Sequence, residues 1–540
     1  MIGLNLALQA PLALSLALAG SGPLPIQECS TVKLTPPLAD GQEVVGYSVV
    51  PDSSDRVAYL SDIMEDSVFQ LYTVPADGSA PGIFFDVGLP EGRAVRGFPA
   101  ISPLGVGVFR ADFDTDNVIE LYSISTADGG GVPLKLNGTL VTGGDVQPEV
   151  VLTPNGASVV YLAEELSTRE ELYIVPITGG DSRRLNAGDE PGDIEEDFQL
   201  TPDGSAVVYR TDNENFREQL YVAPLSGGDP ILLSADLTTS GSVDSFQISA
   251  DGTTVVYAAD RDTRGTDELF RVPITGGTPE KINGPELERS VDGYAISADS
   301  QFVVYTAPSF DGATFRIELY SATLDGGSPI RLNNDLPVQG FINRFVITAD
   351  SAQVIYIGSQ ETAQLNEVYR VPTSGGMPIK LSGNLAGTDG ARGFFLSPDN
   401  QLVVTLADLN PNSSVQVLSF TVTPLAGGAP QPLAGPFIEN GGVNDIVLSP
   451  DSRRIIFSGD LVTEDQTEIF SANLSATGTV QKLSGDLPMG GSVGRFGNDD
   501  FQISAGGDRL IYLADQDRVD VKEVYSSELN CDGVFSNGFE

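Results

Sequence analysis

A four-residue motif recurs along this chain and constrains its fold more than any other feature. Its clear copies begin with Thr or Ser and carry Asp or Asn at the third position. They are Thr153-Pro154-Asn155-Gly156, Thr201-Pro202-Asp203-Gly204, Ser249-Ala250-Asp251-Gly252, Ser297-Ala298-Asp299-Ser300, Thr348-Ala349-Asp350-Ser351, Ser397-Pro398-Asp399-Asn400 and Ser449-Pro450-Asp451-Ser452. Weaker copies lie at Pro51-Asp52-Ser53, Ser102-Pro103 and Ser504-Ala505-Gly506-Gly507. A spacing of about 48 to 55 residues over so many copies indicates a repeat architecture.

Each copy lies among four short apolar segments of strand length, here called strands A to D. In one repeat, strand A is Phe246-Gln247-Ile248 and strand B, after the motif, is Val255-Val256-Tyr257. An acidic loop leads to strand C, Glu268-Leu269-Phe270, and the pair Gly276-Gly277 separates it from strand D, Lys281-Ile282. Paired glycines supply the positive φ of tight hairpins. Four antiparallel strands per repeat, many times over, predict the blades of a β-propeller.

The Asp or Asn of the motif has a local explanation. Followed by a small residue, it makes a side-chain-to-backbone hydrogen bond that suits the reversal between strands A and B. We therefore interpret these residues as turn residues and not as catalysts.

The repeat resembles a known family. The run from Leu200 to Tyr209, followed by Glu218-Gln219-Leu220-Tyr221, Gly227-Gly228 and Leu232-Leu233, is similar to the TolB-type, WD-like propeller repeat. The resemblance covers nearly everything from Ser30 to Leu529. It implies a propeller fold, common in exported bacterial proteins, but no single function, since such repeats serve binding proteins, peptidase-attached domains and polysaccharide-degrading enzymes.

The repeat count predicts how the two ends meet. The last copy supplies strands A, B and C, with Phe501-Gln502-Ile503 as strand A, and then the pattern stops. Val32-Lys33-Leu34 resembles a strand D without a blade. We expect an all-β chain forming one ring of about ten four-stranded blades, in which this N-terminal strand completes the last blade. Two smaller propellers are the alternative, because common propellers have four to eight blades.

The two cysteines offer an independent indication of closure. Alignment of the repeats places Cys29 and Cys531 on the two halves of one interrupted C–D turn. We expect them to form a disulfide, which is typical of an exported protein. Two free thiols are the alternative.

The ends of the chain suggest export. Residues 1–20 carry no charge, are rich in Leu and Ala, and end in small residues, which predicts a signal peptide; a retained anchor is the alternative. We expect a short linker over 21–29, the propeller over 30–529, and a C-terminal tail over 530–540. The protein would then be periplasmic, on the cell surface or extracellular, with no membrane insertion once the signal is removed.

Composition excludes several functions. With 74 acidic and 29 basic residues, the net charge of −45 opposes binding to nucleic acid or to an anionic membrane. The chain has no histidine, so it contains neither a Ser-His-Asp triad nor a His-ligated metal site. Tryptophan, the usual sugar-stacking platform, is also absent.

Carboxylates remain as possible ligands. Asp112, Asp114 and Asp116 alternate as in calcium loops, but Asn117 and Ser123 stand where an EF-hand loop has Gly and Glu. We interpret the acids of the B–C loops as solvated, with calcium near these three aspartates as the alternative; other such loop acids are Asp260, Asp262, Asp267, Asp460, Glu464 and Asp465. We also expect the glutamate that recurs at the start of strand C to be exposed; its copies are Glu120, Glu171, Glu268, Glu318, Glu367, Glu468 and Glu523.

Residues just ahead of strand A are the candidate binding site, because the innermost strands line a propeller's channel. These channel-mouth residues are Arg96, Asp197, Asp244, Asp292, Arg344, Arg392, Asp445 and Asp500. They could hold a cation, a polar ligand or a peptide; a solvated rim without a ligand is the alternative. We therefore expect a non-catalytic scaffold that binds a protein, peptide or glycan, with no resident cofactor. The alternative functions are a lyase or hydrolase acting on carbohydrate through channel carboxylates, and a purely structural surface protein.

Overall fold

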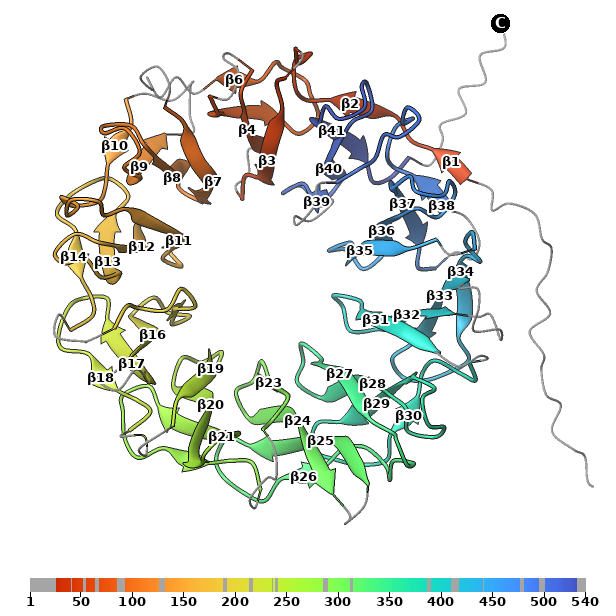
Figure 1. The fold of residues 1–540 in the computed structure, drawn as a ribbon. Helices are drawn as coiled ribbons and strands as arrows, with labels where there is room; N and C mark the ends of the chain where they lie inside the picture. Colours follow the sequence, from red (N-terminus) through yellow and green to blue (C-terminus); the bar gives the residue numbers. More distant parts are fainter. Residues whose placement is uncertain are drawn as a thin grey trace, which may run out of the picture.

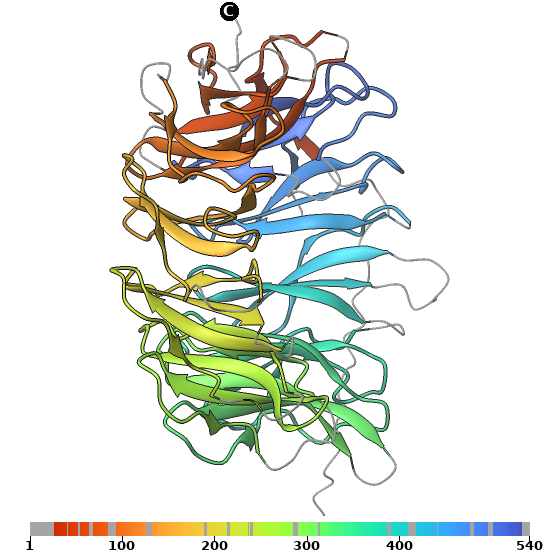
Figure 2. The same ribbon diagram turned by 60° about the vertical axis from the view of Figure 1, so that its left-hand side comes forward.

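The computed structural model describes residues 26–531, apart from residues 40, 52–54, 64–67, 85–92, 126–131, 188–191, 213–216, 236, 238–240, 285–289, 311–313, 386–389, 409–416, 440, 476–479 and 495–500. The described residues form ten sheets arranged in one ring (Figure 1). The turned view shows the strands stacked blade after blade around this ring (Figure 2). The expected single ten-bladed propeller is confirmed. All its elements are strands, and among the described residues no helix is long and apolar enough to span a membrane.

We number the blades in chain order from the first complete one. The innermost strands A of blades 1 to 10 are β3 (Val44–Val49), β7 (Val95–Ser102), β11 (Val146–Leu152), β15 (Gln199–Leu200), β19 (Val243–Ile248), β23 (Gly293–Ile296), β27 (Ile342–Ile347), β31 (Ala391–Leu396), β35 (Val443–Leu448) and β39 (Phe501–Ile503). The B strands are β4 (Arg56–Ser61), β8 (Val106–Ala111), β12 (Ser158–Ala163), β16 (Ala206–Asp212), β20 (Thr254–Thr263), β24 (Phe302–Phe310), β28 (Gln353–Gly358), β32 (Leu402–Asp408), β36 (Arg454–Gly459) and β40 (Arg509–Ala514).

The outer half of each blade is built by strands C and D. The C strands are β5 (Gln70–Pro75), β9 (Glu120–Ser125), β13 (Glu171–Pro176), β17 (Glu218–Pro224), β21 (Thr266–Pro273), β25 (Phe315–Thr323), β29 (Glu367–Pro372), β33 (Leu418–Pro424), β37 (Glu468–Asn473) and β41 (Glu523–Glu528). The D strands are β6 (Ile83–Phe84), β10 (Leu134–Lys135), β14 (Arg183–Arg184), β18 (Ile231–Leu232), β22 (Glu280–Lys281), β26 (Ile330–Arg331), β30 (Ile379–Lys380), β34 (Gln431–Ala434), β38 (Val480–Lys482) and, in blade 10, β2 (Thr31–Lys33).

Blade 10 closes the ring with both ends of the chain. Strand β2 pairs antiparallel with β41, with Val32 opposite Ser526, so the N-terminal strand supplies the missing strand D as expected. Cys29 and Cys531 form a disulfide beside it, with their Cα atoms 5.6 Å apart. The preceding strand, β1 (Ile26–Glu28), pairs parallel with β38 and gives blade 9 a fifth strand. Part of the segment expected to be a linker is thus a strand; residues 1–25 lie outside the described part, so the signal peptide stays a prediction.

Buried apolar side chains pack between neighbouring blades. Alternate residues of strands B and C face the two sides of each sheet, and both sides are covered by the adjacent blades. Within most blades an aromatic pair bridges strands B and C, as in Tyr161 and Tyr173, whose ring centroids are 5.8 Å apart. Such pairs contribute about 0.5–1.5 kcal/mol beyond the area they bury.

The recurring motif forms the A–B turns. In blade 5, Ser249 Oγ donates to Asp251 Oδ1 at 2.6 Å, and the Thr253 N–H donates to the same oxygen at 3.0 Å. These bonds hold the pKa of the Asp251 carboxyl below its usual range. The turn interpretation is confirmed, and the A–B turns also link blades, since Ser300 Oγ accepts the Asp251 N–H at 3.1 Å.

The glutamates at the start of strand C are buried, so their expected exposure is wrong. Their exposed fractions range from 0% at Glu268 to 6% at Glu318. In each of these seven blades the carboxylate pairs with the Lys or Arg of strand D, as Lys380 Nζ does with Glu367 Oε1 at 2.8 Å. In five of them a tyrosine two residues later also donates to the carboxylate. Burial is tolerated because the charge is paired and hydrogen-bonded.

Some acids of the B–C loops are likewise structural and not merely solvated. Asp260 Oδ1 accepts the N–H of Ser242, ahead of strand β19, at 2.6 Å, and Asp460 Oδ1 accepts that of Gly442 at 2.5 Å. Each carboxylate therefore fixes the entry to its innermost strand. The neighbouring Asp262, Glu464 and Asp465 are exposed, as expected.

Candidate functional site at the inner rim

Seven of the ten innermost strands carry a β-bulge or similar irregularity near their first residues. The register of β19 shifts between Val243 and Ser245, and that of β31 shifts between Ala391 and Gly393. The extra residues are Asp244 and Arg392, both exposed channel-mouth residues. A bulge removes a residue from the ladder and redirects its side chain. Along the edge of the sheet that faces the centre of the ring (Figure 1), the bulges therefore present charged groups that regular strands would direct between blades.

Blade 4 contributes an ion pair to this rim. The exposed Asp197 lies just before β15, and its Oδ2 is 3.1 Å from Nη2 of Arg210 on β16. Arg210 also pairs with Glu218 at the start of β17 and donates to the carbonyl oxygen of Val243 in blade 5 at 2.9 Å. One guanidinium thus links two acids and the next blade.

Blades 5 and 6 continue the rim with Asp244 and Asp292. Asp292 is exposed, and its N–H donates to the carbonyl oxygen of Thr306 at 3.0 Å, which fixes the backbone before β23. Between the two aspartates, Ser245 Oγ and Tyr294 Oη lie 3.2 Å apart across the blade boundary. Burial, with a smaller effect of Asp244, raises the pKa of the Tyr294 hydroxyl.

Acidic side chains of blades 3 to 5 lie close to one another, and the exposed Asp292 continues the row on blade 6. We call this group the acidic arc; its members are Glu170, Asp193, Glu195, Glu196, Asp197, Glu218, Asp244, Asp267 and Asp292. Burial followed by repulsion from Asp193 raises the pKa of Glu170, and burial followed by repulsion from Asp244 raises that of Asp267. Burial also raises the pKa of Glu218, although Arg210 opposes the shift. The arc therefore carries more negative charge than its own cations compensate.

The remaining channel-mouth residues lie outside this arc. Arg96 is half-exposed and pairs with the buried Asp112 at 3.1 Å. Arg344 of β27 lies with its guanidinium carbon 5.6 Å from the ring centroid of Phe394 in blade 8. Asp445 lies in the bulge of β35, and its N–H donates to Ser458 Oγ at 3.1 Å.

The eight residues thus do not form one cluster. Asp197, Asp244 and Asp292 follow one another on blades 4 to 6, whereas Arg344 and Arg392 lie on blades 7 and 8. Asp500 lies outside the described residues. The ligand-binding role of all eight stays a prediction.

Sequence reasoning missed a second set of rim residues, the glutamines in the middle of strand A. Gln247 Nε2 donates to the carbonyl oxygen of Tyr294 at 3.0 Å, and its Oε1 accepts the Ile296 N–H at 3.3 Å. Gln502 Oε1 similarly accepts the Val49 N–H at 3.0 Å. The carboxamides join the inner edges of adjacent blades, and the repeated Phe-Gln-Ile sequence was the available signal.

The loop considered for calcium holds its three aspartates in different environments. Asp112 is buried and accepts the Ala94 N–H at 2.8 Å, whereas Asp114 lies 3.4 Å from Lys135 and Asp116 is exposed. Over the described residues, no group of three or more acidic or cysteine side chains is arranged to hold a metal. The expected solvation holds for Asp114 and Asp116 but not for Asp112, and calcium binding here stays an untested alternative.

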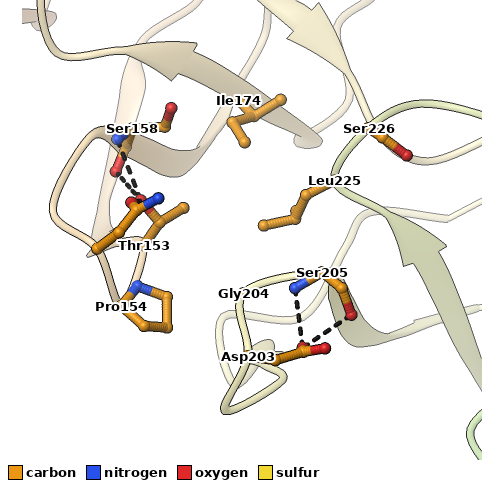
Figure 3. Close-up of a pocket in the computed structure, with 10 residues that line it drawn as sticks. Thr153, Pro154, Ser158, Ile174, Asp203, Gly204, Ser205, Leu225 and Ser226 are labelled. Carbon is orange, nitrogen blue, oxygen red and sulfur yellow. Dashed lines mark hydrogen bonds between the residues drawn. The ribbon is translucent and has the colours of Figure 1, made fainter.

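A pocket of about 350 Å³ lies between blades 3 and 4, at the opposite end of the strands from the rim (Figure 3). It is lined by the two A–B turns, including Thr153 and Asp203. The polar groups of Asp203 and Thr153 already have partners: Asp203 Oδ1 accepts the Ser205 N–H at 3.0 Å and Oγ at 2.8 Å, and Thr153 Oγ1 accepts the Ser158 N–H at 3.1 Å (Figure 3). We interpret this pocket as a consequence of the turn packing.

Comparisons with known proteins are consistent with a propeller and go no further. No family model and no curated protein matches the chain. Among solved structures, a protein assigned as TolB from Agrobacterium tumefaciens is 20% identical, with 43% of this chain and 79% of that chain covered and a TM-score of 0.27. An oligogalacturonate lyase in complex with manganese is 12% identical, over 64% of this chain and 95% of that chain, with a TM-score of 0.35.

The tricorn protease is 12% identical and covers 80% of this chain, with a TM-score of 0.36, but this chain spans only 42% of that protease. At these identities and TM-scores, the likenesses carry no argument about function.

Proposed function

We propose that this protein is an exported, TolB-like propeller that acts as a non-catalytic scaffold and holds a basic segment of a partner protein on its acidic arc. The observation that carries this proposal is that Asp197, Asp244 and Asp292 are exposed on three successive blades along one rim. Repulsion from neighbouring carboxylates, added to the larger effect of burial, raises the pKa of Glu170 and Asp267 in the same arc. Lysine or arginine side chains of a partner would relieve that repulsion. The net charge of −45 would also attract such a partner from a distance. The uncharged N-terminal segment and the disulfide support export.

The test compares binding of a Lys- and Arg-rich peptide to the wild-type protein and to the triple variant Asp197→Asn, Asp244→Asn, Asp292→Asn. We expect the triple variant to bind at least about tenfold more weakly than the wild type at low salt. Above roughly 0.1 M salt this difference in affinity should shrink, because the Debye length falls and the charges are screened from one another. The control is the triple variant Asp181→Asn, Asp229→Asn, Asp325→Asn, at the exposed C–D turns of blades 3, 4 and 6; it removes the same three charges outside the arc and should leave binding within about twofold. Equal losses in both variants would show that net charge alone attracts the peptide.

The pH dependence gives a second readout. The acids of the arc with raised pKa take up protons at a higher pH than the ordinary values of 3.8 for Asp and 4.5 for Glu. Binding should therefore begin to weaken while ordinary surface carboxylates are still ionised. A binding curve that falls only below those ordinary values would contradict a role for Glu218 and Asp267.

A carbohydrate-active lyase or hydrolase is the second candidate. It is favoured by the proximity of Glu218 to Arg210, because burial raises the pKa of the Glu218 carboxyl, and such a carboxyl keeps its proton to a higher pH than an ordinary glutamate does. A screen of purified protein against glycan, ester and peptide substrates separates the two candidates. Turnover that Asp244→Asn or Asp292→Asn abolishes would replace the scaffold assignment with an enzyme.

A further inference from the structure

In three blades the side chain four residues after the buried tyrosine of strand B accepts the hydroxyl hydrogen of that tyrosine; we call such a side chain the plug residue. The plugs of blades 3, 7 and 10 are Glu165, Gln360 and Gln516. In each case Oε1 accepts the hydroxyl of that tyrosine at 2.7 Å. The same oxygen accepts a backbone N–H from the preceding blade, at 2.7, 3.0 and 2.9 Å respectively. One sp² oxygen thus satisfies two donors from two blades.

Other blades fill the position differently. In blade 5 it is Arg261, whose guanidinium carbon lies 5.2 Å from the ring centroid of Phe270. Strand B of blades 2 and 9 has Phe109 and Phe457 in place of the tyrosine. There the position is held by Phe113, whose ring centroid is 5.4 Å from that of Tyr122 on strand C, and by the buried Leu461.

Blade 6 keeps the tyrosine but has no plug among the described residues. Tyr305 is 2% exposed, and the residue four positions on is Ser309. Strands β24 and β25 remain paired as far as Phe310 and Phe315, so the chain stays extended at Ser309 and does not fold back. A pocket of about 570 Å³ lies here, between the outer strands of blades 5 and 6.

The pocket presents hydrogen-bond donors that lack acceptors. Asn283 lines it, is 3% exposed, and has no partner for Nδ2 in the described part of the chain. At the equivalent position in blades 2 and 6, Asn137 and Asn333 donate Nδ2 to the next carbonyl oxygen at 2.9 and 2.8 Å. The Gly284 N–H contacts the Tyr305 hydroxyl, as the Gly485 N–H contacts the Tyr512 hydroxyl at 3.3 Å in blade 10. In blade 10 both of these groups also donate to Gln516 Oε1, so the same pair can donate to an acceptor in the pocket.

We propose that this pocket binds the carboxamide of a glutamine side chain presented by a partner polypeptide. Its donors, a tyrosine hydroxyl and a backbone N–H, are the pair that binds the amide oxygen of Gln360 and Gln516 in blades 7 and 10. A neutral amide suits a chain of net charge −45 better than a carboxylate does. The side chains of Ile282, Ala307 and Pro329 offer apolar contacts to the methylene groups of the glutamine.

This site is on the outer side of the ring and is separate from the acidic arc, so each proposal can fail alone. The probe is the peptide acetyl-Gly-Ser-Gln-Ser-Gly-N-methylamide, in which the glutamine side chain is the only primary carboxamide. It is compared with the same peptide carrying Leu or Glu in place of Gln, with binding followed by ligand-observed NMR. We expect the Gln peptide to bind at least about tenfold more tightly than either, in the millimolar range expected for so small a ligand. Asp244→Asn should leave this binding unchanged.

Two variants with matched controls locate the site. Tyr305→Phe should weaken binding at least about fivefold, whereas Tyr356→Phe, the same change beside the filled position of blade 7, should not. Asn283→Ser removes Nδ2 but keeps an acceptor for the Leu269 N–H, as Ser234 Oγ does for Leu220 at 3.2 Å. It should weaken binding about threefold or more, and Asn333→Ser should leave it unchanged.

Several results would overturn the proposal. They are equal binding of the Gln and Leu peptides, tighter binding of the Glu peptide, equal effects of each variant and its control, or no binding to the wild-type protein at peptide concentrations on the order of 10 mM. Competition by N-acetylglucosamine at equal concentration would assign the pocket to an acetamido sugar instead and would also overturn it.

Discussion

Blades 7 and 10 have the same interior but different chain connectivity. In blade 7, Lys380 Nζ lies 2.8 Å from the buried Glu367; in blade 10, Lys33 Nζ lies 2.6 Å from the buried Glu523. The first pair joins residues 13 apart in one hairpin. The second joins the N-terminal strand to the last strand of the ring.

The agreement extends to the neighbouring side chains. Tyr369 and Tyr525 donate to the two glutamates at 2.6 and 3.1 Å, and the plug residues Gln360 and Gln516 make equivalent bonds. The two blades differ in the conformational entropy that is lost when strand D pairs with strand C. The loss is larger in blade 10, because its two strands lie at opposite ends of the chain and meet only when the whole ring is formed. The disulfide and the extra strand β1 occur at this discontinuity, and we infer that they compensate for it.

Removing the disulfide should have the largest effect. Replacing both Cys29 and Cys531 by Ser should lower the free energy of unfolding by roughly 4–6 kcal/mol in the entropic model, because the bond closes a loop of 502 residues. Guanidinium unfolding measures the loss, and reduction of the wild-type protein should reproduce it while leaving the variant unchanged. Two alkylatable thiols in the native exported protein would contradict the bond.

Removing the lysine from each blade should have the next largest effect. Lys380→Met and Lys33→Met each leave a buried glutamate without its cation, which costs roughly 3–5 kcal/mol. With the disulfide intact the two losses should be similar, and under reducing conditions Lys33→Met should become the more severe. Leu232→Met, at the same register position in blade 4, is the control and should change stability by less than about 1 kcal/mol.

The importance of charge pairing in both blades would be contradicted if each lysine variant lowered the free energy of unfolding by less than about 1 kcal/mol, which is the contribution of an exposed ion pair. In that case, the glutamates would be held by their tyrosines and backbone, and not by charge pairing.

The repeat made the ring predictable. The A–B motif, the Gly-Gly turns and the apolar triplets recur at the same positions in each repeat, so a correct interpretation of one repeat applies to the others. The last copy lacks strand D, which predicts the closure by β2. Turn chemistry is local, so it can be read from adjacent residues.

The buried glutamates were misread because their partners lie on another strand. The signal was present as co-occurrence. Where the residue two positions before the tyrosine of strand C is Gln70 or Gln219 instead of Glu, the strand D residue paired with that tyrosine is Phe84 or Leu232 instead of Lys or Arg. A charged residue considered alone predicts exposure, whereas a charge that appears only with its counterion predicts a buried pair. The bulges of the inner strands could not be read, because they depend on register and not on residue type.

Converting blade 7 to the pattern of blade 4 should have the smallest effect. The double variant Glu367→Gln, Lys380→Leu reproduces Gln219 and Leu232, and it removes both charges together, so no buried charge is left unpaired. Replacing a buried ion pair by groups of similar volume is often nearly neutral, and we expect a change within about 1.5 kcal/mol. A loss as large as that of Lys380→Met would show that blade 7 needs the pair itself.

The pH dependence separates the double variant from the wild type further. Burial lowers the pKa of Lys380, but hydrogen bonds to Glu361 and Glu367 outweigh it and raise the pKa above 10.5. A raised folded-state pKa means that the pair stabilises fully below the unfolded value of 10.5 and that this stabilisation is lost as the pH rises through the folded value. The wild type should therefore lose more stability than the double variant in unfolding curves measured at increasing pH above 10.5. If the wild type and the double variant lost the same free energy of unfolding over this pH range, the pKa of Lys380 would be the same in the folded and the unfolded chain. The ion pair would then contribute no pH-dependent stability.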